Sequence, residues 1–383
     1  MNQTPGVPLL DINRGNAAQR DEILAAVTRV IDSGRFLFGP DVAALEKSIA
    51  ELCHAEHAVA CASGSDALLL ALLALDVGEG DEVIVPSFTF FATASAVWRL
   101  GARPVFVDID PQTFNLDPNQ VEDAISPLTR AIIPVHLFGQ CADMDAIGQI
   151  ASQHDLLVIE DAAQAIGATF HGRLAGSMSA IGCFSFYPTK NLGALGDGGM
   201  LTTSDAALAE RLRLFAAHGM SPRYYHQVVG ICSRLDSIQA AVLNVKLPQL
   251  GKWIAGREAN AARYTRELSA AGLGVGLALP QRDERCGHAW NQYTVRIGGG
   301  RRDAVRTQLA AAGIGSEIYY PVPLHLQKCF QSLGYGPGSL PETERAAREV
   351  LSLPIFAELT EGELTTVVSR LTSILRSPLA KAA

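Results

Sequence analysis

A lysine and an aspartate stand at positions that suit the chemistry of an aldehyde cofactor. Lys190 lies in residues 184–191, ahead of a glycine-rich run, and Asp161 closes an apolar run 29 residues earlier. A lysine amine can form a Schiff base with an aldehyde, and a carboxylate can keep a pyridine nitrogen protonated so that the ring accepts electrons. Pyridoxal phosphate (PLP) requires both groups, so the pair predicts a PLP site in which Lys190 and Asp161 are catalytic.

A site for the cofactor phosphate is expected at residues 62–66, which follow a candidate strand and open a helical stretch. The first backbone N–H groups of a helix and its dipole attract anions. Gly64 would let the phosphate approach the backbone, and the Ser65 and Ser185 hydroxyls would donate to it. The alternatives are an ordinary Ser/Asp helix cap and, at position 185, a serine buried in a strand.

Three further positions are expected to contact the cofactor ring. Gln164, three residues beyond the aspartate, could bond the phenolic oxygen, and Ala163 is small enough to lie against one face. Of the three phenylalanines in residues 86–91, we expect two in the core and Phe90 stacked on the pyridine. Glu160 is the weaker candidate for the ring nitrogen, and both neighbouring acids could instead cap the following helix.

Composition limits the partners and the compartment. The 383 residues are 48% apolar, enough for a large core and two domains, and the net charge is −8 without a Lys/Arg cluster. This balance argues against nucleic acid. Seven cysteines without a Cys-x-x-Cys pair favour reduced thiols in a cytoplasmic enzyme. No apolar run is long enough to cross a membrane, and residues 54–57 lack a third metal ligand, so neither a membrane nor a metal is expected.

Short apolar runs alternate with helical stretches from residue 58 onward. Because several of the runs lack polar alternation, they predict strands covered on both faces. The rhythm predicts an α/β fold with a mostly parallel, doubly wound sheet, whose ligands bind at the carboxyl ends of the strands. The expected strands are 58–61, 82–86, 104–108, 131–135, 156–160, 181–186 and 199–203, and the expected helices are 20–33, 66–75, 91–100, 118–126, 143–153 and 236–249.

Two domains are expected. Residues 1–250 would form the large domain, led by an extended N-terminal arm over residues 1–20. Beyond Trp253 the charges and helix formers increase, which favours a smaller C-terminal α+β domain at 251–383. Its expected elements are a strand near 290–297 and helices at 302–312, 341–350 and 361–376.

Four motifs together resemble the DegT/DnrJ/EryC1/StrS family of PLP-dependent nucleotide-sugar aminotransferases, over nearly the whole chain. They are Ser-Gly-Ser-Asp-Ala-Leu at 63–68, Pro-Ser-Phe-Thr-Phe at 86–90, Glu-Asp-Ala-Ala-Gln at 160–164 and Phe-Ser-Phe-Tyr-Pro-Thr-Lys-Asn at 184–191. The resemblance implies PLP fold type I, like that of aspartate aminotransferase, with a mixed seven-stranded sheet. It also implies a homodimer with two shared active sites.

The resemblance further implies an amino-acid donor, glutamate more than glutamine, and a 3-keto hexose on UDP or dTDP, used for polysaccharides or secondary metabolites. Residues 230–236 resemble the stretch that reaches into the partner's site, where Arg234 would bind an anionic substrate group. Tyr320 and His325 would contact the sugar, although each could be structural. Cys232 replaces the family's usual Asn, and a thiol is a poorer donor to the neighbouring phosphate.

Other hypotheses concern relatives with different chemistry. Sugar dehydratases that resemble this chain carry histidine in place of Lys190, which disfavours that reaction. A regulatory, catalytically divergent homologue is disfavoured by the complete set of Lys190, Asp161, Gln164 and Ser185, although Cys232 leaves an opening for it. The glycines of 193–199 do not match the dinucleotide fingerprint, which disfavours a nicotinamide enzyme.

Overall fold

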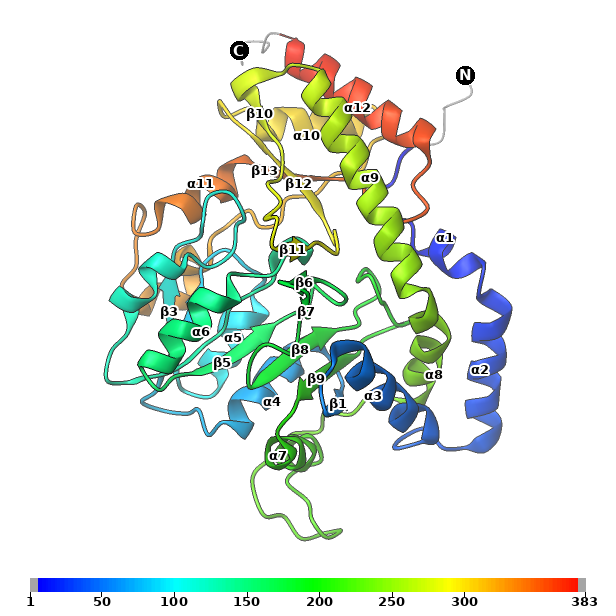
Figure 1. The fold of residues 1–383 in the computed structure, drawn as a ribbon, viewed down its shortest axis with the longest axis vertical. Coiled ribbons are helices and arrows are strands. Elements are labelled where there is room, and N and C mark those ends of the chain that lie inside the picture. The colour runs from blue at the N-terminus through cyan, green and yellow to red at the C-terminus, as the bar shows by residue number, and fades with distance from the viewer. Residues whose placement is uncertain (1–5, 378–383) are drawn as a thin grey trace.

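Seven strands form one central sheet in the computed structural model, which describes residues 6–377. The order is β1-β9-β8-β5-β4-β2-β3, and β9 alone among these strands runs antiparallel to both of its neighbours. All seven expected strands are present, so the predicted mostly parallel α/β sheet is confirmed (Figure 1). Their bounds are His57–Cys61 (β1), Glu82–Pro86 (β2), Arg103–Val107 (β3), Thr129–Ile132 (β4), Leu157–Asp161 (β5), Ile181–Ser185 (β8) and Gly199–Thr203 (β9).

Apolar clusters cover both faces of this sheet. Alternate residues of a strand point to opposite faces, and in β2 Ile84 joins one buried cluster while Val83 and Val85 join another. Helices α3, α6 and α8 contribute to the first cluster, and α4, α5 and α7 contribute to the second. Their bounds are Pro40–Cys53 (α3), Gly64–Ala74 (α4), Ala92–Arg99 (α5), Met144–Gln153 (α6), Ala206–Ala216 (α7) and Ser237–Lys246 (α8), and α2 (Arg20–Ser33) packs on α8.

One predicted helix is wrong. Residues 118–126 form two short 3₁₀ turns, η1 (Pro118–Gln120) and η2 (Glu122–Ala124), instead of an α-helix. Val121 is the only buried side chain of this stretch. The segment therefore offers no apolar stripe that packing could stabilise as a helix.

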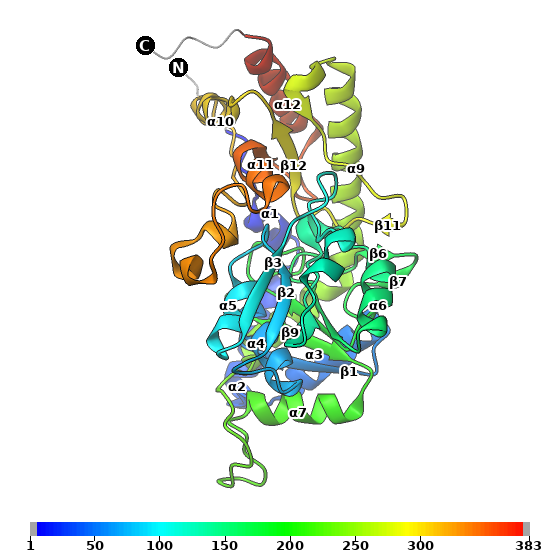
Figure 2. The same ribbon diagram turned by 90° about the vertical axis from the view of Figure 1, so that its left-hand side faces the viewer.

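A second, smaller sheet forms in the C-terminal part, in the order β10-β12-β13 (Figures 1 and 2). The expected strand and the three expected helices are present, whereas β13 was not foreseen because it follows α11 without a break. The division at residue 250 stays a prediction; the chain continues there from η4 (Leu247–Gln249) directly into α9. The bounds are Leu250–Ala270 (α9), Leu277–Ala278 (β10), Tyr293–Ile297 (β12), Arg302–Ala311 (α10), Pro341–Glu349 (α11), Val350–Leu353 (β13) and Glu361–Arg376 (α12).

The sequence predicts an extended N-terminal arm, but the structure shows a helix within it. Residues 1–5 of the predicted arm lie outside the described residues. After them, Val7 forms a β-bridge with Ile314, and Ile12–Ala17 form the short helix α1, whose N-cap is Asp11. Arg14 of this helix donates to Glu363 of α12 at 2.9 and 2.7 Å. These contacts hold the segment against the C-terminal part of the chain.

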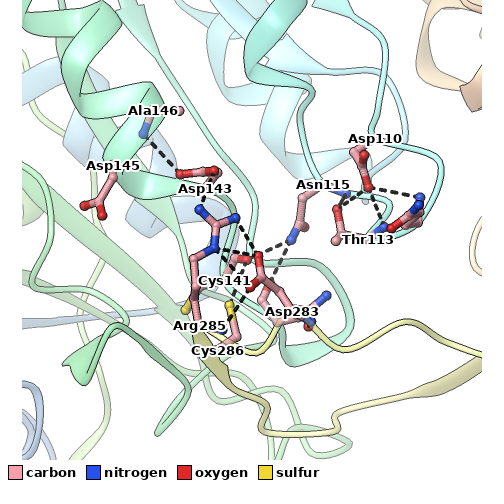
Figure 3. A network of polar contacts seen from close by, with 12 residues as sticks. Asp110, Thr113, Asn115, Cys141, Asp143, Asp145, Ala146, Asp283, Arg285 and Cys286 are labelled. Atoms are coloured by element: carbon pink, nitrogen blue, oxygen red, sulfur yellow. Dashed lines mark hydrogen bonds and ion pairs between the residues drawn. The ribbon is translucent and has the colours of Figure 1, made fainter.

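A polar network docks the segment before β12 onto the start of α6 (Figure 3). The segment includes β11 (Cys286–Gly287), which pairs with β6 (Thr169–Phe170), and β6 pairs with β7 (Arg173–Leu174). Arg285 donates to Asp143 at 2.8 Å and to Asp283 at 2.6 Å. The bonds to Asp283, more than those to Asp143, raise the pKa of the Arg285 guanidinium above its usual value. The network faces solvent and is structural.

Candidate active site

Lys190 and Asp161 are positioned by two neighbouring parallel strands. β5 ends at Asp161 and β8 ends at Ser185, and the two strands pair side by side. Beyond β8 the chain turns tightly, with the Lys190 N–H donating to the Tyr187 carbonyl at 2.9 Å. Burial lowers the pKa of Lys190 to about 8, and the Asp161 carboxylate opposes that shift. The two predicted catalytic groups therefore lie within electrostatic reach of each other, at the carboxyl edge of the sheet.

The Asp161 carboxylate is buried, and in the part of the chain that the structure describes it has two donors. Thr93 Oγ1 donates to Oδ2 at 2.8 Å, and the Ala163 N–H donates to Oδ1 at 3.2 Å. Burial raises the pKa of Asp161, while those two bonds and the nearby Lys190 act in the opposite direction. A carboxylate accepts up to about four hydrogen bonds, so Asp161 retains capacity for a cationic partner such as a protonated ring nitrogen.

Glu160 points to the other face of β5, as strand alternation requires. Its carboxylate accepts from the backbone N–H groups of Gly176 and Met178, both at 2.7 Å, and from Ser179 Oγ at 3.0 Å. His136 Nδ1 accepts from the Ala142 N–H, so Nε2 carries the proton that it donates to Glu160 at 3.0 Å. Glu160 is thus fully engaged within the fold, in agreement with its ranking as the weaker candidate.

The phosphate loop and Ser185 converge. Helix α4 begins at Gly64, and Ser63 is its N-cap, accepting from the Asp66 N–H at 3.1 Å. A Cβ placed on Gly64 would lie 2.6 Å from the Ser185 Cβ, so only glycine fits this contact. Ser185 Oγ accepts from the Tyr187 N–H at 3.3 Å, which leaves its own proton available to donate.

This geometry suits an anion between the helix start and the serine. The first N–H groups of a helix have no partner within the helix, and Ser65, one residue into α4, is exposed. The cap that was considered as an alternative is also present, but it is made by Ser63. The cap therefore does not occupy the hydroxyls expected to bind phosphate.

Gln164 is held in one orientation beside Tyr320. Its Oε1 accepts from the Phe138 N–H at 2.7 Å, and its Nε2 donates to the Tyr320 hydroxyl at 3.1 Å. The amide has a second N–H, which suits the phenolic oxygen expected there. Ala163 is half-buried next to Asp161. The structure thus brings together four predicted residues around the end of β5: Asp161, Ala163, Gln164 and Tyr320.

Only one of the three phenylalanines after β2 is in the core, which corrects the expectation of two. Phe88 is 1% exposed, whereas Phe91, which directly precedes α5, is 43% exposed although its ring packs on the buried Phe330. Phe90, the expected stacking residue, is 56% exposed, and its ring centroid lies 6.1 Å from that of Tyr320. Its ring can therefore still be reached by a ligand.

Two of the predicted substrate residues, Arg234 and His325, are engaged in contacts with other parts of this chain. Arg234 donates to Cys232 Sγ at 2.9 Å, and its guanidinium lies 5.8 Å from the Phe38 ring, in a separate hollow. The intervening Ser233 donates to Asp66 at 2.8 Å, behind the phosphate loop. His325 is 1% exposed and is hydrogen-bonded inside the fold. Their roles toward substrate stay predictions.

Sequence reasoning missed the residues that orient the site. Thr93, which donates to Asp161, and Phe138, whose N–H fixes Gln164, carry no motif of their own. Ser87, which bonds His325, does lie within a motif, the one at 86–90. Within residues 6–377, three or more His, Cys, Asp or Glu side chains nowhere gather in an arrangement that could hold a metal ion.

The residues present fit PLP. Lys190 supplies a half-buried amine with a lowered pKa, Asp161 an incompletely bonded carboxylate, and Gly64 with Ser185 a cradle that a larger side chain would fill. These groups on a mostly parallel sheet with a smaller C-terminal sheet define a PLP-dependent enzyme of fold type I.

The chain belongs to the DegT/DnrJ/EryC1/StrS aminotransferase family, which matches residues 17–372. It is 50% identical to the pleiotropic regulatory protein of Geobacillus stearothermophilus, over 97% of this chain and 99% of that protein. It is 46% identical to the UDP-N-acetyl-3-dehydro-alpha-D-glucosamine 3-aminotransferase of Acidithiobacillus ferrooxidans, over 99% of this chain and 100% of that protein.

A solved structure agrees. The crystal structure of S. venezuelae DesV in complex with a ketimine intermediate has a TM-score of 0.95 and 45% identity, covering 98% of this chain and 100% of that chain. The predicted family, fold type, cofactor and enzyme class are therefore confirmed: the protein is a PLP-dependent aminotransferase.

Proposed function

We propose that the protein transfers the amino group of an amino acid, glutamate in first place, to carbon 3 of a keto-hexose carried on UDP or dTDP. The observation that carries the proposal is the 46% identity to a UDP-sugar 3-aminotransferase over essentially the whole of both chains. The contacts of Lys190, Asp161, Gln164 and Ser185 are consistent with transamination.

The chain's own residues have distinct tasks in this reaction. PLP, when bound, supplies the electron sink. Lys190 Nζ would accept and release the proton of the donor's α-carbon, and a pKa near 8 suits a group that must do both near neutral pH. Asp161 would keep the ring nitrogen of PLP protonated, and Gln164 and Phe90 would orient the ring.

Both half-reactions use the same groups in turn. The donor leaves as 2-oxoglutarate before the keto-sugar enters, so a single site must accept an amino acid and a nucleotide sugar. The exposed ring of Phe90 and the Tyr320 hydroxyl bonded to Gln164 support an approach of the sugar from this side. We assign Tyr320 to the sugar-binding side of the site.

We also propose a homodimer with shared active sites. The chain between α7 and α8 projects from the body of the protein below α7 (Figures 1 and 2). This segment exposes large side chains, with Tyr224 at 74%, Tyr225 at 70% and Val229 at 94%. Such exposure favours burial against a second copy. Arg234 would then act on a substrate anion in the partner's site.

A cytoplasmic location in polysaccharide or secondary-metabolite synthesis is proposed as well. All seven cysteines are free thiols, which fits a reducing compartment. Among residues 6–377, the helices are all too short or too polar to span a bilayer.

Absorbance spectroscopy and mass spectrometry test the proposed function. The PLP-loaded protein should lose its visible band when glutamate is added, with pyridoxamine phosphate appearing. Keto-sugars on UDP and dTDP, keto at carbon 3 or carbon 4, are then supplied as a panel. Amination of a 3-keto member is expected, and Lys190→Ala is the control. If glutamate converts PLP to pyridoxamine phosphate but no 3-keto sugar is aminated, the substrate assignment is refuted.

A regulatory role is the second candidate, because a relative with 50% identity carries the name of a regulatory protein and Cys232 departs from the family motif. A regulator would bind the cofactor without turnover. Failure of glutamate to convert the cofactor in a correctly folded, PLP-loaded protein would favour it.

A further inference from the structure

Tyr320 lies in a segment with little regular structure. The segment, residues 317–326, runs from a β-bridge between Glu317 and Ser352 to the 3₁₀ turn η6 (Leu324–Leu326). Because such a loop is not held by a ladder of its own, the position of Tyr320 depends on the anchors at the two ends.

The first anchor is on the small sheet. The Glu317 N–H donates to the Ser352 carbonyl at 3.2 Å, and the Ser352 N–H donates to the Glu317 carbonyl at 2.8 Å. Ser352 belongs to β13. This end of the loop is therefore fixed by backbone bonds that depend little on side-chain identity.

The second anchor is on the large sheet and depends on side chains. The Leu324 N–H donates to the Ser87 carbonyl at 2.9 Å, and the His325 N–H donates to Ser87 Oγ at 3.1 Å. The Ser87 hydroxyl lies 2.7 Å from His325 Nδ1. Since Ser87 Oγ already accepts from a backbone N–H, its own proton is available for the imidazole.

The other side of the imidazole faces α11. With Nδ1 accepting, Nε2 carries the proton and lies 3.4 Å from Glu344 Oε1, which also accepts from the Gly338 N–H at 2.6 Å. Ser87 is 0% and His325 1% exposed. A serine, a histidine and a glutamate in this order suggest a hydrolytic triad, but a buried hydroxyl cannot meet a substrate. The cluster joins the loop at His325 to Ser87 and to α11, and its role is structural.

We propose that His325 is a positioning residue that fixes Tyr320 against the keto-sugar, by joining residues 317–326 to β2 and α11. The inference deepens the proposed function and rests on it. Phe88 directly follows Ser87, and its ring centroid lies 6.2 Å from that of Tyr320. Movement of Ser87 or His325 is therefore passed to Tyr320 through a packed ring and through the loop backbone.

Two substitutions test this role. His325→Leu removes both ring nitrogens, whereas His325→Asn keeps an acceptor near the place of Nδ1. The KM for UDP-N-acetyl-3-dehydro-alpha-D-glucosamine should rise about tenfold in the Leu variant, because small misplacement of a binding group weakens a productive geometry. The half-reaction with glutamate should change much less, because the Phe138 N–H still holds Gln164, and the Asn variant should recover most of the loss. Equal loss in both half-reactions would overturn the proposal.

A double-mutant cycle with Tyr320→Phe separates positioning from general weakening. If His325 acts through the Tyr320 hydroxyl, the double variant should be no worse than the poorer single variant, since the two changes remove one interaction. Additive effects on KM would show that His325 acts by another route and would overturn the proposal.

Hydrogen exchange gives a measurement that does not need turnover. Amides of residues 317–326 should exchange about tenfold faster in His325→Leu, because one anchor of the segment is lost. If that variant does not fold, Ser87→Ala, which keeps the Leu324 bond, takes its place. A wild-type protein that aminates no 3-keto sugar would refute the proposed function, whatever the exchange shows. If the wild-type protein aminates a 3-keto sugar but hydrogen exchange in the variant is unchanged, the role of His325 is refuted and the proposed function stands.

Discussion

The two faces of β5 carry adjacent buried carboxylates with opposite surroundings. Glu160 accepts from three backbone or hydroxyl donors and from His136, and those groups leave it no free capacity. Among residues 6–377, Asp161 accepts from Thr93 and Ala163 only, lies beside Lys190, and has a pKa that burial raises. The fold satisfies the Glu160 carboxylate, whereas the Asp161 carboxylate retains capacity to accept from a ligand.

The difference shows how a site can be recognised in a strand whose side chains are all buried. A charge without enough partners is costly in a protein interior, so an incompletely bonded carboxylate at a strand's carboxyl end indicates a place where a cationic group can bind. Glu160 and Asp161 have the same charge and neighbouring positions. They differ in their hydrogen-bond partners, and that difference is why we propose a structural role for Glu160 and a catalytic role for Asp161.

The largest expected effect is on the Asp161 face. Lys190→Ala should reduce transfer by at least about a thousandfold, because it removes both the covalent anchor and the proton-transferring amine. The free energy of unfolding of the cofactor-free protein should not fall, because burial disfavours the charged amine. Borohydride should fix cofactor to residue 190 of the wild type and not to the variant. Near-normal transfer by a folded Lys190→Ala protein would contradict the assignment.

The matched pair Asp161→Asn and Glu160→Gln tests the comparison itself. Asp161→Asn should lower transfer by about a hundredfold or more, since the ring nitrogen loses its anionic partner. Glu160→Gln should instead lower the free energy of unfolding by about 2 to 3 kcal/mol, because its amide N–H₂ would face backbone donors. Denaturant titration and steady-state kinetics measure the two effects.

The control in this pair is the stability of Asp161→Asn without cofactor. The raised pKa of Asp161 means that its favourable contribution is present at low pH and is lost as the pH rises through the folded-state value. The Thr93 hydroxyl can also reverse its bond to suit an amide. Stability at pH 7 should therefore stay within about 1 kcal/mol of wild type. If both variants lose stability equally, the contrast between the faces is wrong.

A smaller effect is expected in the pH dependence of cofactor capture. The neutral amine of Lys190 is the reactive form, so the rate at which cofactor-free protein binds PLP covalently should rise with pH up to about 8 and then level off. Asp161 raises the pKa of Lys190, so Asp161→Asn should move the midpoint to lower pH. Stopped-flow absorbance measures the rate, and Glu160→Gln should leave the midpoint in place.

The sequence could predict the sheet because its strands are covered on both faces and read as short apolar runs. It could not show that β9 is antiparallel or that β13 follows α11 without a break, since neither depends on composition. Lys190 and Asp161 could be found because each closes or follows a buried strand. Thr93 could not, because its bond to Asp161 spans 68 positions.

His325 illustrates the same limit more sharply. Its motif suggested a substrate contact, but its bond to Ser87 joins residues 238 positions apart. Local sequence carries no information about such a pairing. A motif therefore identifies residues that matter, whereas burial and hydrogen-bond partners are needed to say what they do.

The smallest expected effect concerns carboxylates that solvent can reach. Asp143 and Asp283 are each paired with Arg285 at the surface (Figure 3), so water can replace the guanidinium. Arg285→Ala should lower the free energy of unfolding by less than about 1 kcal/mol, because exposed ion pairs are screened, and this loss should shrink further in high salt. Transfer activity should not change. A loss as large as that of Glu160→Gln, measured by the same denaturant titration, would show that the count of partners, rather than burial, decides what a carboxylate contributes in this fold.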